Sequence, residues 1–114
     1  MTDNDFVKNV EREVLEDMFN RYFNTMETID RSSVNDPYWK KILTLYDTLD
    51  INGKDNLKAL VRLVMIDLLS NIFAKLDGVS SFKNQTNQFD LRYGDITISG
   101  DLQEIFLMDV EENF

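Results

Sequence analysis

The chain has 114 residues, of which 43% are apolar and 29% are charged, so it is long enough for one hydrophobic core but too short for two. We therefore expect a single domain over residues 1–114. The chain contains no cysteine and no histidine, which excludes disulfides, thiolate metal sites, cysteine nucleophiles and histidine acid–base chemistry. These absences favour a non-enzymatic protein with no cofactor and no bound metal.

The net charge of −9 is concentrated in the two ends of the chain. Residues 1–35 carry 8 acidic and 4 basic side chains, residues 36–77 carry 6 of each, and residues 78–114 carry 7 and 2. Acidic ends disfavour nucleic acid and favour a basic protein as partner. The N-terminus lacks the cationic start and apolar stretch of a signal peptide, and polar residues interrupt the apolar segment 57–76, so we expect a cytoplasmic protein outside the membrane.

The first predicted element is an amphipathic helix over residues 5–30, because apolar residues recur there at steps of three and four. Asp3, Asn4 and Asp5 precede it and supply oxygen atoms that cap free backbone amides. The predicted buried stripe consists of Val7, Val10, Val14, Met18, Tyr22, Met26 and Ile29, widened by Leu15, Phe19 and Phe23.

Two further helices are predicted over residues 37–51 and 55–77. Asp36 and Pro37 suit the start of the second helix, and we expect Asn52 and Gly53 to break the chain between the two. The third helix is apolar around most of its circumference, which predicts a central, buried position. Gly78 should end it.

Residues 78–88 lack periodicity and should form an exposed loop. Alternating apolar and polar residues then predict a β-hairpin over 89–99, with Gly94 and Asp95 in its turn. In this register Tyr93 faces Ile96, and the next apolar pair is Leu91 and Ile98. A lone hairpin is marginally stable, so its apolar face should lie against helices.

A short C-terminal helix is predicted over residues 102–112, because Asp101 and Glu104 have the spacing of a capping box. Its apolar residues point in several directions, so we expect either a helix wedged between the hairpin and the bundle or one apolar side exposed to a partner. We favour the wedge. The predicted fold class is α+β, mainly α: a three-helix bundle followed by a β-hairpin and a short C-terminal helix.

Other patterns give weaker signals for chemistry. Acidic clusters such as Glu13, Glu16 and Asp17 contain oxygen ligands for a hard cation, but such runs usually form a solvated face. Asp67 has apolar neighbours, so burial would raise its pKa and suit it to acid–base work; we expect instead a structural carboxylate at the edge of the core. Tyr38 and Trp39 more often belong to a core than to a stacking platform.

The blocks SNIFAKLDGVSSF (residues 70–82) and ISGDLQEIFLMDVEEN (residues 98–113), with the acidic character of the whole chain, resemble the immunity and inhibitor proteins of bacterial toxin systems. The resemblance implies a non-enzymatic, protein-binding module that masks a basic surface of a cognate toxin, such as a nuclease. The alternative is a self-associating structural or regulatory protein, a homodimer whose seam contains Leu107, Met108 and Phe114. The predicted partner-binding residues are Asp101, Glu104, Leu107, Met108, Asp109, Glu111 and Glu112, with Glu13, Glu16 and Asp17 second.

Overall fold

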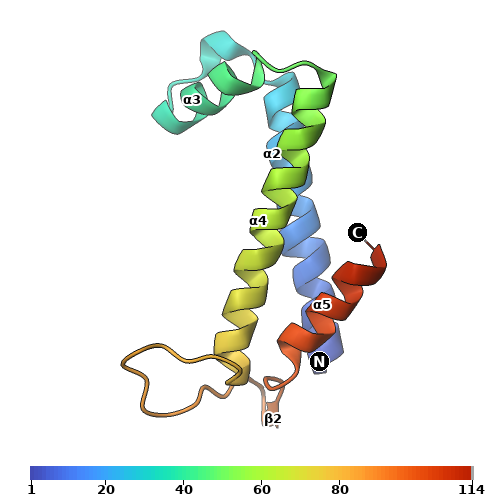
Figure 1. The fold of residues 1–114 in the computed structure, drawn as a ribbon, viewed down its shortest axis with the longest axis vertical. Coiled ribbons are helices and arrows are strands. Elements are labelled where there is room, and N and C mark those ends of the chain that lie inside the picture. The colour runs from blue at the N-terminus through green and yellow to red at the C-terminus, as the bar shows by residue number, and fades with distance from the viewer. Residues whose placement is uncertain (114) are drawn as a thin grey trace.

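A computed structural model describes residues 1–113, of which most lie in helices, and the fold class is α+β, mainly α, as predicted. The N-terminal half forms one nearly continuous helix of three segments, followed by a short 3₁₀ turn and a second helix. A long helix, a two-stranded hairpin and a last helix complete the chain (Figure 1). The elements are α1 (Asp3–Asn9), the π-helix η1 (Val10–Glu16), α2 (Asp17–Thr28), the 3₁₀-helix η2 (Arg31–Ser33), α3 (Pro37–Tyr46), α4 (Ile51–Asp77), β1 (Arg92–Tyr93), β2 (Ile96–Thr97) and α5 (Leu102–Asn113).

The molecule is elongated, with extents of 50 × 33 × 24 Å. In Figure 1, α4 forms a shaft along the longest axis and runs antiparallel to the helix that α1, η1 and α2 build. At one end of the shaft α3 projects to the side, and at the other end α5, the hairpin and a long loop gather. The first and last helices, α1 and α5, are in contact at this second end of the shaft.

Two hydrophobic clusters hold the shaft. The first joins α2, α3 and α4 and has Phe23, Leu43 and Tyr46 among its buried members. The second joins α1, η1, α4 and α5, and its fully buried members include Leu15 and Phe106. Because α4 contributes side chains to both clusters, it is the element that connects the two ends of the molecule.

The buried stripe of the first helix differs from the predicted one, because the chain is a π-helix over Val10–Glu16. A π-turn takes up more residues than an α-turn, so it rotates everything after it relative to the residues before it. Leu15, predicted at the edge of the stripe, is therefore fully buried in line with Val7, whereas Val14, predicted at its centre, is 45% exposed. Met18 and Tyr22 are displaced outward by the same rotation.

The predicted break at Asn52 and Gly53 is wrong. The second predicted helix, which is α3, ends earlier, at Tyr46, and α4 begins at Ile51, so Asn52 and Gly53 lie in the first turn of α4. The reason is a cap: the side chain of Asp50 accepts a hydrogen bond of 2.7 Å from the Gly53 N–H, and a glycine in the first turn of a well-capped helix is tolerated. Gly78 ends α4 in a left-handed conformation (φ 78°), as predicted.

The hairpin has the predicted register, with Tyr93 opposite Ile96, but its regular strands span only two residues each. A hydrogen bond of 2.8 Å from the Ile98 N–H to the Leu91 carbonyl extends the pairing by one step. Ile98 is buried, whereas Tyr93 and Ile96 are exposed, so the inner half of the predicted apolar face packs and the tip does not. Residues 78–91 contain no helix or strand, as predicted for 78–88.

The expectation that the long helix is buried around its circumference is wrong. Only Phe73 and Ala74 of α4 are buried, and five large apolar residues of the helix beyond its first turn are about half exposed. The physical reason is that α2, α3 and α5 cover only one side of the shaft. The exposed residues are Leu60, Leu63, Val64, Leu68 and Ile72.

Candidate functional site

The C-terminal helix α5 has one firmly buried side. Leu102 and Phe106, one turn apart, are both fully buried, and the Phe106 ring meets the Phe73 ring of α4 edge to face at 5.4 Å. Beside them the Gln103 amide donates a hydrogen bond of 3.1 Å to the Ser70 hydroxyl. These contacts fix the orientation of α5 on α4 and thereby decide which of its residues face solvent.

The start of α5 is capped by a residue of α4. The side chain of Asp77 accepts hydrogen bonds from the Gly100 N–H (2.6 Å) and from the Gln103 N–H (2.8 Å). Its negative charge lies where the dipole of α5 favours an anion. The predicted capping box named Asp101 for this role, but the capping oxygen for Gln103 comes from a residue 26 positions earlier, which only the fold brings near.

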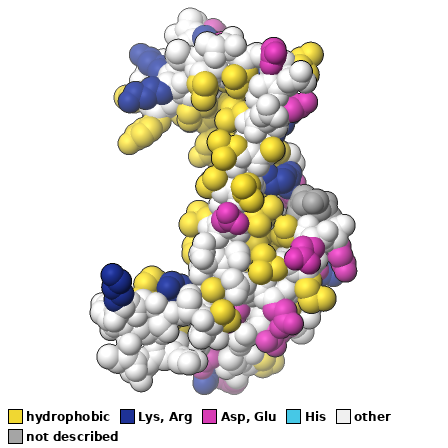
Figure 2. Space-filling model, viewed as in Figure 1, with side chains coloured by type: hydrophobic (Ala, Val, Ile, Leu, Met, Phe, Trp, Pro, Cys, Tyr) yellow, Lys and Arg dark blue, Asp and Glu magenta, His cyan; other side chains and the backbone are white. Residues whose placement is uncertain are grey.

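The opposite side of α5 is exposed and has an apolar centre with an acidic border. Leu107 and Met108 are 37% and 57% exposed, and Glu104 and Glu111 are one turn before and one turn after them on the same side. Figure 2 shows acidic side chains over the part of the surface where α5 lies. We call this surface the α5 face; it consists of Asp101, Glu104, Leu107, Met108, Glu111 and Glu112.

The favoured expectation that α5 is wedged with both apolar sides buried is therefore wrong. The helix touches α1 and α4 along one side only, because the hairpin stops at its N-terminal end and covers nothing beyond it. The alternative, one apolar side that faces outward, is what the fold contains. Phe114, named with Leu107 and Met108 in the dimer seam, lies outside the described residues.

Asp109 alone of the predicted residues on this helix lies on its packed side. It faces Glu11 of η1, and one carboxyl oxygen of each residue is shielded from solvent. Burial, followed by the charge of Asp109 and a hydrogen bond to it, raises the pKa of Glu11 to about 7. Lys8 and Arg12 oppose this rise only in part. Asp109 thus joins α5 to η1 rather than facing outward.

The second predicted group does not join the α5 face. Glu16 is half-buried and accepts a hydrogen bond of 2.6 Å from Arg62 of α4, whose guanidinium also lies 4.3 Å from the centre of the Phe19 ring. Glu13 lines a groove of about 400 Å³ between the first helix and the hairpin. Asp17 is exposed on α2. The carboxylates of this group therefore point to separate places.

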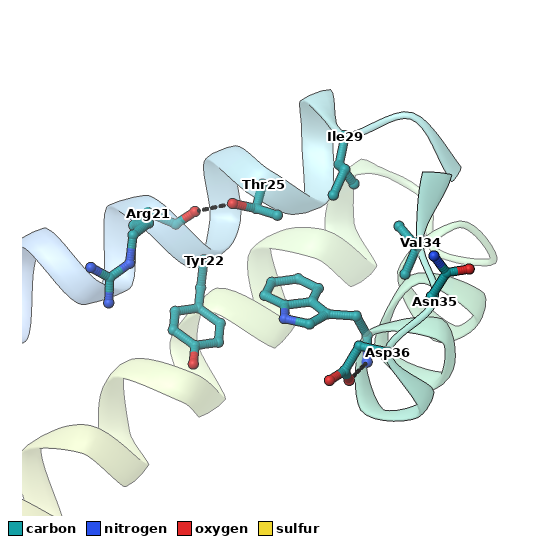
Figure 3. Close-up of a pocket in the computed structure, with 8 residues that line it drawn as sticks. Arg21, Tyr22, Thr25, Ile29, Val34, Asn35 and Asp36 are labelled. Atoms are coloured by element: carbon teal, nitrogen blue, oxygen red, sulfur yellow. Dashed lines mark hydrogen bonds between the residues drawn. The ribbon is translucent and has the colours of Figure 1, made fainter. Parts of the chain in front are cut away.

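Another groove, of about 440 Å³, lies between α2 and the start of α3 (Figure 3). Its aromatic wall is made by Tyr22 and Trp39, whose rings stack at 5.3 Å. Asp36 faces the same groove, but its side chain accepts a bond from the Trp39 N–H and so belongs to the cap of α3. Tyr38 does not line this groove and is 78% exposed, contrary to the expectation that both aromatic residues lie in the core.

Catalytic and metal-binding alternatives find little support in the described residues. Asp67 lies on the outward side of α4 and is exposed, so it is not a buried acid suited to acid–base work, and the expectation that it lies at the edge of the core is wrong. Within residues 1–113 no group of three or more acidic side chains is arranged to hold a metal ion. No helix in that range is long and apolar enough to cross a membrane.

Sequence reasoning missed three residues that organise this region: Glu11, Asp77 and Arg62. Glu11 had a signal, because it lies four residues after Val7 and four before Leu15, and an acid between two buried positions is unusual. Asp77 had none, since it looked like the ordinary polar end of α4.

Comparison with protein-family models, with curated proteins and with solved structures found no match to this chain.

Proposed function

We propose that this protein is a non-enzymatic binding module that uses the α5 face to mask a basic surface of another protein, in the manner of an immunity or inhibitor protein that neutralises a toxin. The observation that carries the proposal is the composition of the α5 face. It combines two adjacent exposed apolar side chains, Leu107 and Met108, with four acids and no base. Exposed apolar residues inside a polar border are typical of protein contact sites.

The two parts of the α5 face have different tasks in this proposal. The acids attract a basic partner over a distance of about one Debye length and so raise the association rate. Leu107 and Met108 lose their exposed area on contact and supply affinity that salt does not screen. The buried anchors Leu102 and Phe106 hold the helix in place before the partner arrives, which lowers the entropy cost of binding.

The test begins with the intact protein as bait for basic proteins of its native host, followed by binding measurements with the purified partner. The face variant is Glu104→Lys/Glu111→Lys/Glu112→Lys, and the control is Asp17→Lys/Asp55→Lys/Asp95→Lys, which changes the net charge equally at three exposed sites elsewhere. We expect the face variant to lose at least tenfold in affinity and the control to lose much less.

A separate variant, Leu107→Ala/Met108→Ala, should speed dissociation with little effect on the association rate. The purified partner's own activity, measured with and without an equimolar amount of this protein, distinguishes an inhibitor from a simple adaptor. Equal weakening by the face variant and the charge control would place the contact elsewhere and contradict the proposal. A partner that binds the intact protein but keeps its full activity would contradict the inhibitor role.

A further inference from the structure

The molecule exposes more surface than a compact chain of its mass. Its accessible area is 8076 Å², whereas a compact monomer of this size exposes about 6,500 Å². Its radius of gyration is 17.6 Å, against about 13 Å for a compact domain of this length. The surplus, about 1,600 Å², is twice what one partner contributes to a standard interface, at about 800 Å² each. The α5 face can account for only part of it.

Much of the exposed apolar surface outside the α5 face lies on α4. Leu60, Val64, Leu68 and Ile72 follow one another at steps of four residues and are 56%, 55%, 59% and 47% exposed. We call these four residues the α4 ridge. At 1.5 Å per residue the ridge is about 18 Å long, and Figure 2 shows hydrophobic side chains along this middle part of the shaft.

The α4 ridge lies away from every contact described above. Phe73, which packs on α5, is nine residues after Val64, about two and a half turns, so the two side chains point in opposite directions. The ridge is therefore not a part of the α5 face. Asp67 and Asn71, both exposed, flank it on one side and give it the polar border of a protein interface.

We infer that the α4 ridge is the seam of a homodimer, in which the ridge of one copy packs against the same ridge of a second copy. Rows of side chains at steps of four interdigitate with each other, which is the commonest class of helix packing, so one such ridge is complementary to itself. The elongated shape leaves room for such a contact, because the whole molecule exposes about 1,600 Å² more than a compact monomer and one partner's share of a standard interface is about 800 Å².

The charge distribution favours a second copy over a basic partner at this seam. Residues 36–77, which include α4, carry 6 acidic and 6 basic side chains, whereas the rest of the chain holds the entire net charge of −9. Two copies can therefore meet along α4 without net charge repulsion, while a basic partner gains no net electrostatic attraction there. The acidic α5 faces remain free on the outside of the dimer for the partner proposed above.

The test is the mass of the full chain in solution, by sedimentation velocity and light scattering over a hundredfold range of concentration. We expect a dimer of twice 13.4 kDa that dissociates in the variant Val64→Glu/Leu68→Glu. The matched control is Ile51→Glu/Asn52→Glu, which places the same two negative charges on the same helix at exposed residues off the ridge. It should remain dimeric, and far-UV circular dichroism should show unchanged helix content in both.

Two added charges could prevent folding of the free chain, so a milder variant, Leu68→Ala, is measured as well. It should raise the dimer dissociation constant at least tenfold. A wild-type chain that is monomeric over the whole range overturns the inference. A dimer that survives Val64→Glu/Leu68→Glu, or one that dissociates only in Leu107→Glu/Met108→Glu, overturns it as well. The ridge variants should still bind a basic partner through the α5 face, so this inference and the proposed function fail separately.

Discussion

Glu11 of η1 and Asp109 of α5 place two carboxyl groups against each other in the contact between the two ends of the chain. Both belong to packed helix sides that are otherwise apolar, with Val7 and Leu15 one turn before and after Glu11. The π-helix keeps Glu11 in line with these two buried residues. A proton held by Glu11 allows α5 to pack there, whereas two full charges would repel each other.

This pairing predicts a stability that decreases as the pH rises from 5 to 8. Burial and the charge of Asp109 raise the pKa of Glu11 to about 7, from an ordinary value of 4.5, so the folded state holds this proton more tightly than the unfolded state. The contribution of Glu11 is complete below pH 4.5 and is lost as the pH passes about 7. Allowing for solvent screening at a half-buried site, we expect a loss of about 1 kcal/mol, measured by urea unfolding.

The variant Glu11→Gln should remove this pH dependence, because its amide donates a hydrogen bond to Asp109 without a charge at any pH. Glu13→Gln, on the exposed side of the same π-helix, is the matched control and should retain it. If the free energy of unfolding changes equally with pH in the wild type and in Glu11→Gln between pH 5 and 8, the pair does not govern the packing of α5.

Asp77 should be the residue on which the order of α5 depends most. Asp77→Ala removes the acceptor of the Gly100 and Gln103 amides, and we expect a loss of about 1 to 2 kcal/mol. Hydrogen exchange should show faster exchange of the first-turn amides of α5, with little change in α3. Asp77→Asn should recover part of the protection. Asp101→Ala is the control. If both alanine variants lower the free energy of unfolding equally, the capping box predicted from sequence also caps α5.

Tyr46 should stabilise the other end of the shaft through its hydroxyl. The residue is 1% exposed, and its hydroxyl donates a hydrogen bond to Glu27. Burial and this bond raise the pKa of Tyr46 to about 12, so the folded state favours the neutral phenol and loses stability as the pH rises from 10 towards 12. Tyr46→Phe should lower the free energy of unfolding at neutral pH by about 1 kcal/mol.

The matched control for Tyr46 is Tyr38→Phe at a residue that is 78% exposed, which should leave the stability unchanged. An ultraviolet titration of the folded wild type should show one of the four tyrosines ionising later than the others, and this late step should be missing in Tyr46→Phe. A late step that persists in that variant would assign the high pKa to another tyrosine.

The sequence determined the fold class and the order and approximate bounds of the helices, together with the hairpin register, because these depend on local periodicity and turn chemistry. Gly78 at the end of α4 and the pairing of Tyr93 with Ile96 are examples. The break at Asn52 and Gly53 was wrong because a single cap, Asp50, outweighed two poor helix formers. Local patterns do not reveal which of two such competing signals prevails.

Only the tertiary structure decided which sides of the helices are buried. The π-helix moved the centre of the buried stripe from Val14 to Leu15, which the apolar pattern had placed at its edge, and the pattern did not indicate this change of backbone pitch. Likewise, the apolar residues of α4 and α5 fit both a buried and an exposed position, and packing on one side alone left Leu68 and Met108 outside. Contacts such as Asp77 with Gln103 and Glu11 with Asp109 join residues far apart in the chain. Sequence periodicity reports that a helix has an apolar side, and the arrangement of its neighbours decides whether that side is covered.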